Sequence, residues 1–283
     1  MTTGGRSMAF SSSGSITPIA NARMYSATPA VRAEWRRLLQ WVLARAGLDW
    51  PVVDYDAPAP LSVLWAREDL GLATMCGLPF SQRAVRPTLI AAPVPSPPRY
   101  GGRPIYFTDI VVRAASPHQR LEDSFGGVVG YTLADSMSGG VALAAHLALF
   151  RQRHGARLFR AAVGGLVNAR GVIEALAEGR IDVGPLDSYY HDLLRHNEPA
   201  LAAQVRVVAS TGAMPIPPFV ATAALGAEEL KRLRDALRAV ATADELQATR
   251  RCLLLEGFAL PDAADYAVLA GIADRPLPSF EEL

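Results

Sequence analysis

Short apolar runs alternate with amphipathic segments along the chain from Ile16 onward. Apolar runs bounded by turn residues are typical of buried strands, whereas apolar residues spaced three and four apart mark helices that pack one face against a sheet. A regular exchange between these two patterns predicts an α/β architecture.

The first part of the chain contains one strongly marked helix among several strands. Thr28 is a predicted N-cap, Pro29 fits the first helical position, and Gly47 is expected to end the helix. The apolar positions between them form one stripe: Val31, Trp35, Leu38, Leu39 and Val42. Other predicted elements are strands at 16–24, 51–55, 70–76 and 89–94, a short helix at 61–66 and a turn at 77–80.

The later part repeats this pattern and adds two long extended runs. Residues 105–113 and 214–220 are predicted to cross between lobes, and prolines hold the second run extended. Between them we expect strands at 128–133, 158–163, 181–184 and 205–209, and helices at 138–153, 168–178 and 189–196. Helices at 227–242 and 263–273 are predicted to finish the chain.

Two crossings imply two α/β lobes with a cleft between them. We expect residues 16–110 and 217–283 to form the first lobe, residues 111–216 the second, and residues 1–15 a disordered leader. Open α/β sheets bind ligands outside the carboxyl ends of their strands, so the cleft is the expected binding site.

The run Asp135-Ser136-Met137-Ser138-Gly139-Gly140 lies between a predicted strand and a predicted helix. The first N–H groups of a helix lack intrahelical partners, and the helix dipole leaves that end partly positive. The hydroxyls of Ser136 and Ser138 add donors, and the glycines allow an oxyanion to approach the backbone. The run therefore predicts a cradle for a phosphate, phosphonate, sulfonate or carboxylate, although the same residues also describe an ordinary N-cap.

Composition narrows the classes of partner. With 283 residues, 50% of them hydrophobic, and a net charge of +1, the chain suits a globular protein, and neither nucleic acid nor direct membrane insertion is expected. Cys76 and Cys252 fit neither a metal cluster nor a disulfide framework, so no cofactor or metal is predicted. Residues 1–17 lack the apolar run of a secretory signal, which favours a cytoplasmic location for the chain as given.

Five segments in order connect the chain with a known family: 75–80 (MCGLPF), 102–109 (GRPIYFTD), 135–139 (DSMSG), 171–187 and 215–218 (PIPP). Through them the chain resembles the substrate-binding components of phosphonate, phosphite and phosphate ABC importers, which are type 2 periplasmic binding proteins. The resemblance implies a two-lobed Venus-flytrap fold in which two crossing segments form the hinge. It also implies a small anionic ligand, an ABC permease as partner, a periplasmic location and a monomer.

The resemblance further implies which residues of the second lobe meet the ligand. The oxyanion would be held by Ser136, Ser138, Gly139 and the backbone of Met137, and Asp187 would supply an acidic group that faces the ligand. The position of Met137 commonly carries a small hydroxyl residue, so its side chain makes the pocket more apolar. Residues 162–167 contain no His where aminophosphonate binders commonly carry one, which argues against 2-aminoethylphosphonate.

On the first lobe, the resemblance implies contacts from the Cys76-Gly77 turn and from an aromatic side chain, either Phe80 or Tyr25. Cys76 is also expected to be a buried small hydrophobic residue near the cleft, because free cysteines are usually buried. No His or Lys base accompanies the serines of the cradle, and no metal or nucleotide motif occurs, so an enzyme is not expected. The alternative is a cytoplasmic ligand sensor or a cofactor-biosynthesis enzyme on the same fold.

Four further residues have competing interpretations. Asp109 could contact the ligand across the hinge, cap a turn, or pair with Arg113. Tyr106 could line the cleft or pack in the core, because side chains on a strand alternate between its two faces. His191 and His196 lack the spacing of a helical zinc pair, and we expect both at the surface.

Overall fold

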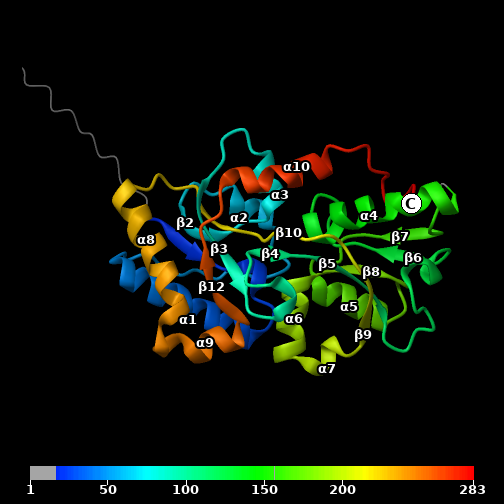
Figure 1. Ribbon diagram of the computed structural model, residues 1–283, viewed down its shortest axis with the longest axis horizontal. Coiled ribbons are helices and arrows are strands. Elements are labelled where there is room, and N and C mark those ends of the chain that lie inside the picture. Colours follow the sequence, from blue (N-terminus) through cyan, green and yellow to red (C-terminus); the bar gives the residue numbers. More distant parts are fainter. Residues whose placement is uncertain (1–16, 156) are drawn as a thin grey trace, which may run out of the picture.

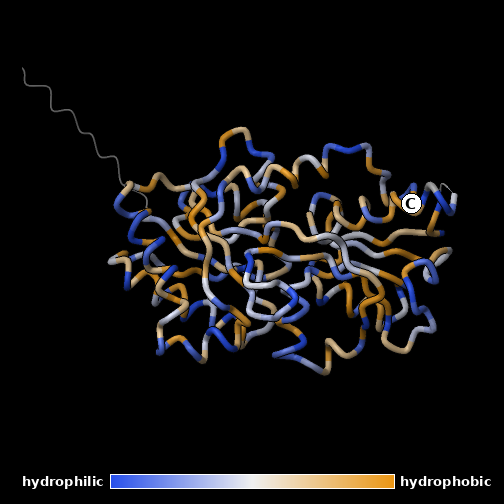
Figure 2. Tube along the Cα trace, in the orientation of Figure 1, coloured by the Kyte–Doolittle hydropathy of each residue, from blue (hydrophilic) through white to orange (hydrophobic). Residues whose placement is uncertain are grey.

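The computed structural model describes residues 17–155 and 157–283 of the chain. The predicted leader at residues 1–15 lies outside the described residues. The elements fall into two α/β lobes that lie side by side along the longest axis of the molecule (Figure 1). Hydrophobic residues follow the central strands of both lobes, and hydrophilic residues are concentrated in the outer loops (Figure 2).

The first lobe is built on a five-stranded sheet with the order β1-β2-β11-β3-β12. Strand β1 runs parallel to β2, and β11 and β12 run antiparallel to their neighbours. The strands are β1 Ile19–Asn21, β2 Leu70–Thr74, β3 Thr88–Pro95, β11 Phe219–Ala221 and β12 Leu255–Ala259. One side of this sheet is covered by α1 (Pro29–Ala46), α8 (Ala227–Ala239) and α9 (Gln247–Cys252), and the other by α2 (Leu61–Trp65), α3 (Gly77–Gln82) and α10 (Ala267–Ala273) (Figure 1).

The second lobe contains a three-stranded sheet with the order β8-β5-β9 and a parallel pair, β6 and β7. A bridge between Val129 and Val183 joins the two sets of strands. The strands are β5 Thr108–Arg113, β6 Val128–Gly130, β7 Ala161–Val163, β8 Gly184–Asp187 and β9 Val205–Ser210, and the helices are α4 Ala142–His154, α5 Ala169–Ala177, α6 Ser188–Asn197 and α7 Pro199–Ala202. Between the lobes, β4 (Ile105–Tyr106) pairs antiparallel with β10 (Met214–Pro215), so the two predicted crossings lie side by side.

Helix α1 forms as its local signals predict. The Thr28 hydroxyl accepts a hydrogen bond from the N–H of Val31 at 3.1 Å, and Gly47 ends the helix in the left-handed conformation with φ 65°. All five residues of the predicted stripe are buried. Burying a large apolar side chain contributes about 1.5–3 kcal/mol, so this face fixes α1 against the first lobe.

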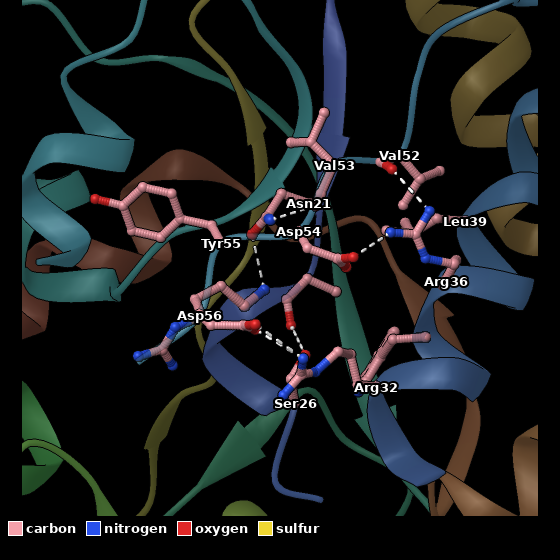
Figure 3. A pocket seen from close by; sticks show the side chains of 13 residues that line it. Asn21, Ser26, Arg32, Arg36, Leu39, Val52, Val53, Asp54, Tyr55 and Asp56 are labelled. Atoms are coloured by element: carbon pink, nitrogen blue, oxygen red, sulfur yellow. Dashed lines mark hydrogen bonds and ion pairs between the residues drawn. The ribbon is translucent and has the colours of Figure 1, made fainter. Parts of the chain in front are cut away.

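The predicted strand at residues 51–55 is wrong, because only Val52 bridges to Ala20. This segment is held to α1 by charges instead. Arg36 donates to the carbonyl of Val52 at 2.9 Å and pairs with Asp54 at 2.6 Å, and Arg32 pairs with Asp56 (Figure 3). The acidic residues of this segment therefore bind the surface of α1, and the segment adds only a single bridge to the edge of the sheet.

The predicted turn at residues 77–80 is also wrong, because these residues begin α3. Gly77 serves packing and not a turn, since a Cβ there would lie 2.5 Å from Cδ1 of Leu269 on α10. The strand expected at 181–184 is shifted to β8 at Gly184–Asp187, and the strand expected at 158–163 begins only at Ala161. Helix α9 and strand β12 were not predicted.

A third segment crosses between the lobes after α10, in addition to the two that the resemblance implied. The ring of Phe280 stacks on Tyr131 of the second lobe, with centroids 3.9 Å apart and planes at 8°. The carbonyl of Leu283 accepts hydrogen bonds from the N–H groups of Leu158 and Phe159. Phe280 and Leu283 thus complete a hydrophobic cluster of the second lobe.

Candidate ligand-binding cleft

A cavity of about 380 Å³ is lined by residues from both lobes. From the first lobe come Tyr25 and Cys76, and from the second come Ser136, Ser138, Gly139 and Asp187, all predicted from the sequence. Cavities of this size are typical of sites for small molecules. The cavity is therefore the candidate binding site.

The predicted cradle forms the start of a long helix. Residues Met137–Val141 are π-helical and continue directly into α4. Ser136 is the N-cap, and its hydroxyl accepts from the N–H of Gly139 at 3.3 Å. A Cβ on Gly140 would lie 2.3 Å from the carbonyl oxygen of Leu133, so the preceding loop requires glycine there. Short π-helical turns inside helices occur frequently at functional sites.

Five predicted site residues are not among the residues that line the cavity. They are Gly77, Phe80, Tyr106, Asp109 and Met137, and all five are buried. Phe80 packs edge-on against Tyr266, with ring centroids 5.2 Å apart. Of the two candidates for the aromatic wall, Tyr25 therefore lines the cavity and Phe80 supports the elements around it.

Asp187 lies where β8 ends and α6 begins. Its Oδ1 accepts hydrogen bonds from the N–H groups of Tyr189 at 2.9 Å and Tyr190 at 3.0 Å, and its Oδ2 accepts from the hydroxyl of Tyr25 at 3.4 Å. Burial raises the pKa of Asp187 to about 7, although the two backbone donors oppose this shift. Near neutral pH, a protonated Asp187 can therefore donate a hydrogen bond to an anion in the cavity.

The raised pKa of Asp187 predicts a pH-dependent stability. The unfolded carboxyl loses its proton near pH 4 and the folded one near pH 7, so the folded state holds the extra proton between these values. Stability should therefore fall as the pH rises from about 4 to about 7. We expect the melting temperature of the wild-type protein to fall more between pH 5 and pH 8 than that of Asp187→Asn. Parallel curves would contradict the assignment.

Arg23 was missed by the sequence analysis. It is the only Arg or Lys among the described residues that line the cavity, and it forms no ion pair within residues 17–155 and 157–283. Burial lowers its pKa, but a guanidinium keeps its charge at physiological pH. Its position in the sequence could have identified it as a site residue, because Arg23 lies two residues after the end of β1, at the carboxyl end of a strand that faces the cleft. Thr132 and Asn168 also line the cavity and were not predicted, and Tyr190 lines it as well.

Asp109 belongs to a buried polar network near the crossing segments. Its carboxylate accepts hydrogen bonds from the guanidinium of Arg99 at 3.0 Å and from the hydroxyl of Ser210 at 2.9 Å. Nδ1 of His191 lies 3.0 Å from the same carboxylate, and the His191 side chain is fully buried. The predicted surface position of His191 is therefore wrong, and the alternatives of a turn cap or a pair with Arg113 are replaced by these partners.

The chemistry of the lining fits reversible binding. In the part of the chain that the structure describes, no three His, Cys, Asp or Glu side chains are grouped so that they could hold a metal ion. Burial raises the pKa of the Cys76 thiol, so this residue is neutral at physiological pH.

Within residues 17–155 and 157–283, no helix combines the length and hydropathy that a bilayer crossing requires.

Two solved structures illustrate the likeness of the fold. A binding-protein component of an ABC phosphonate transporter from Pseudomonas aeruginosa is 17% identical and superposes with a TM-score of 0.75, over 94% of this chain and 92% of that one. PhnD1 from Prochlorococcus marinus, solved in complex with methylphosphonate, is 14% identical with a TM-score of 0.71, over 91% and 97% of the two chains. The expected two-lobed type 2 periplasmic-binding-protein fold is thus confirmed.

At the level of sequence, no curated protein matches the chain. The family model for periplasmic substrate-binding proteins of phosphonate ABC transporters, however, matches residues 26–266. That family consists of transport proteins and not of enzymes, and it is periplasmic, so the cytoplasmic location suggested by residues 1–17 is not supported. The chain belongs to the phosphonate-binding family of periplasmic substrate-binding proteins of ABC transporters.

Proposed function

We propose that this protein captures a phosphonate in the cavity between its lobes and delivers it to the permease of an ABC importer. The observation that carries the proposal is the lining of the cavity, where Ser136 and Ser138 on the second lobe are joined by the cation Arg23 on the first. Hydroxyls, amides and a guanidinium together are the donors that a tetrahedral oxyanion needs. PhnD1 from Prochlorococcus marinus, of the same fold, was solved with methylphosphonate, which supports this class of ligand.

The second lobe would bind the oxyanion through the start of the helix at residues 137–154. The N–H groups of Met137 and Ser138 begin this helix, where the dipole favours negative charge. Gly139 keeps the backbone accessible, and the hydroxyls of Thr132 and Ser136 complete the donors on this side. The predicted contribution of Met137 is thus its backbone alone.

The first lobe would close on the ligand with Arg23, Tyr25 and Cys76. Arg23 supplies the charge, and Tyr25 links the lobes through its hydrogen bond to Asp187. In its protonated form Asp187 adds a donor, whereas its ionised form would repel an oxyanion. We therefore propose that the protein closes as a monomer and joins a charged first lobe to a polar second lobe. The expected first lobe of residues 16–110 and 217–283 would then move relative to residues 111–216, except that Phe280 and Leu283 would stay with the second lobe, against which they pack.

Gly77, Phe80, Tyr106 and Asp109 would act behind the cavity wall. Phe80 and Gly77 pack α3 against Tyr266 and α10, which fixes the position of Cys76. Tyr106 is buried on β4, and Asp109 holds the polar network on β5. These residues would position the two lobes without touching the ligand.

Removing the Ser138 hydroxyl tests the proposed function. A hydrogen bond to a charged group contributes about 1.5–3 kcal/mol, so Ser138→Ala should bind methylphosphonate roughly ten- to a hundredfold more weakly. Thermal shift and calorimetric titration of purified protein would measure this, with inorganic phosphate and methanesulfonate as further ligands. A ligand present at about 100 times its Kd stabilises the native state by about 2.7 kcal/mol, which gives a clear rise in Tm.

Ser96→Ala is the matched control, because Ser96 is exposed and outside the cavity lining. It should bind as the wild type does. If neither wild type nor control binds any phosphorus oxyanion, the proposed function is wrong. If the wild type and Ser138→Ala bind with equal affinity, the oxyanion does not bind at the start of this helix.

A further inference from the structure

The cavity is larger than a small phosphonate requires. Its volume of about 380 Å³ corresponds to about a dozen water-sized groups, by the volume that water occupies in the liquid. A phosphonate group with a single methyl fills less than half of this space. Closure of the lobes would narrow this space, and the chemistry of the walls decides whether water or a substituent on the ligand fills what remains.

The walls are divided by polarity between the lobes. The hydroxyl and amide groups described above come mainly from the second lobe. Besides Arg23, Tyr25 and Ser62, the first lobe supplies mostly apolar side chains: Met24, Pro58, Pro60, Leu61, Trp65 and Pro79. The only polar hydrogen of the Trp65 side chain is already used, because Nε1 donates to the carbonyl of Thr74 at 3.0 Å. Around Leu61 and Trp65 the wall therefore offers mainly carbon surface, which binds apolar groups and gives ordered water few partners.

The mouth of the cavity is apolar as well. Leu133 is 47% exposed and Val167 is 45% exposed, and both line the cavity. Large side chains of this type that remain exposed beside a cavity are characteristic of a ligand-binding surface. A substituent that leaves the cradle would pass between these two residues and the wall formed by the first lobe.

Val167 is held at this mouth by a strained backbone. Its φ is 66°, and the N–H of Asn168 donates to the carbonyl of Leu166 at 2.7 Å, which closes a γ-turn around Val167. Such a conformation is rare for a β-branched residue, and strain of this kind is concentrated at ligand sites. A Gly or Asn would adopt the turn with less strain. The strained turn therefore serves to place the isopropyl group of Val167 at the mouth of the cavity.

We propose that the ligand is a phosphonate with an apolar substituent several carbons long, bound with its oxyanion on the cradle and its substituent against Leu61 and Trp65. Leu133 and Val167 cover the substituent at the mouth. This inference rests on the proposed function and names the substrate class of the same site. A substituent that places a charge directly against Leu61 and Trp65 is disfavoured, because these two side chains offer that charge no partner.

The test is a series of phosphonates that differ only in chain length. Calorimetric titration of the full chain with methyl-, ethyl-, propyl- and butylphosphonate should show affinity rising about fourfold for each methylene, or about fiftyfold from methyl to butyl. Binding of methylphosphonate with no gain along the series would overturn the inference and leave the proposed function intact. No binding of any member would overturn the proposed function itself.

Two variants of α2 test where the substituent of the phosphonate binds. Leu61 lines the cavity, whereas Val63 on the same helix is 58% exposed and does not line it. Leu61→Ser should lower the affinity for butylphosphonate about tenfold and that for methylphosphonate much less, and a far-ultraviolet circular dichroism spectrum equal to that of the wild type would show that the variant is folded. Val63→Ser should change neither. A butylphosphonate affinity in Leu61→Ser equal to that of the wild type would overturn the assignment of this wall.

Discussion

Replacement of Asp109 by alanine should lower the free energy of unfolding by about 3 kcal/mol, because it breaks a buried ion pair from one side. Asp109 is fully buried and accepts from both terminal nitrogens of Arg99 at 3.0 Å and from Ser210 at 2.9 Å. Burial alone would raise the pKa of this carboxyl, but His191 and Arg99 hold it below its usual value. Without the carboxylate, Arg99 and the buried His191 ring lose their common partner.

Denaturant unfolding monitored by circular dichroism would measure this loss. The matched control is Asp235→Ala, which removes an exposed carboxylate paired with Lys231 at 2.9 Å on α8. An exposed pair of this kind is worth less than about 1 kcal/mol. A similar small change in both variants would show that the Asp109 network does not stabilise the junction between the lobes.

Replacement of Gly139 by alanine should lower the affinity for methylphosphonate by about five- to a hundredfold. The new Cβ would lie 1.7 Å from Oγ1 of Thr132 and 2.9 Å from its Cβ, so Thr132 would be forced to move. Thr132 and Gly139 both line the cavity, and overpacking of such a site costs about 1–3 kcal/mol. The loss should appear in calorimetric titration together with an unchanged far-ultraviolet circular dichroism spectrum.

Gly271→Ala is the control for this change. Gly271 lies in α10, and a Cβ there would meet nothing within 4 Å. Alanine stabilises a helix relative to glycine by up to about 1 kcal/mol, so this variant should be at least as stable as the wild type and bind equally well. Wild-type affinity in Gly139→Ala would mean that the oxyanion binds elsewhere in the cavity.

The parts of the fold that the sequence predicts are those governed by local hydrogen bonding. Thr28 and Gly47 mark the ends of α1 because a cap is made by residues within one turn of the helix. Ser136 and Gly139 mark the start of the helix at residues 137–154 for the same reason. The π-helical turn at Met137–Val141 was not predicted, because its geometry depends on how closely Leu133 and Thr132 approach the glycines.

Local patterns are misleading where a segment is held by distant partners. Residues 51–55 alternate as a strand does, but their charges bind α1. Gly77 has the appearance of a turn residue, but its missing Cβ makes room for Leu269, which lies far along the chain. An alternation with a period of two, or a glycine, shows which conformations a backbone can adopt. The packing partner then determines which of these conformations it adopts.

The sequence by itself determined the α/β class, the two-lobed family, the helix start at Ser136, and the positions of Cys76 and Asp187 in the cavity lining. Only the tertiary structure decided that Arg23 faces the cavity, that His191 is buried against Asp109, and that Phe280 joins the second lobe. The physical reason is that caps and apolar periodicity act within a few residues. Burial, charge pairing and cavity shape arise where elements distant in sequence meet, as Asp109 and His191 do across 82 positions.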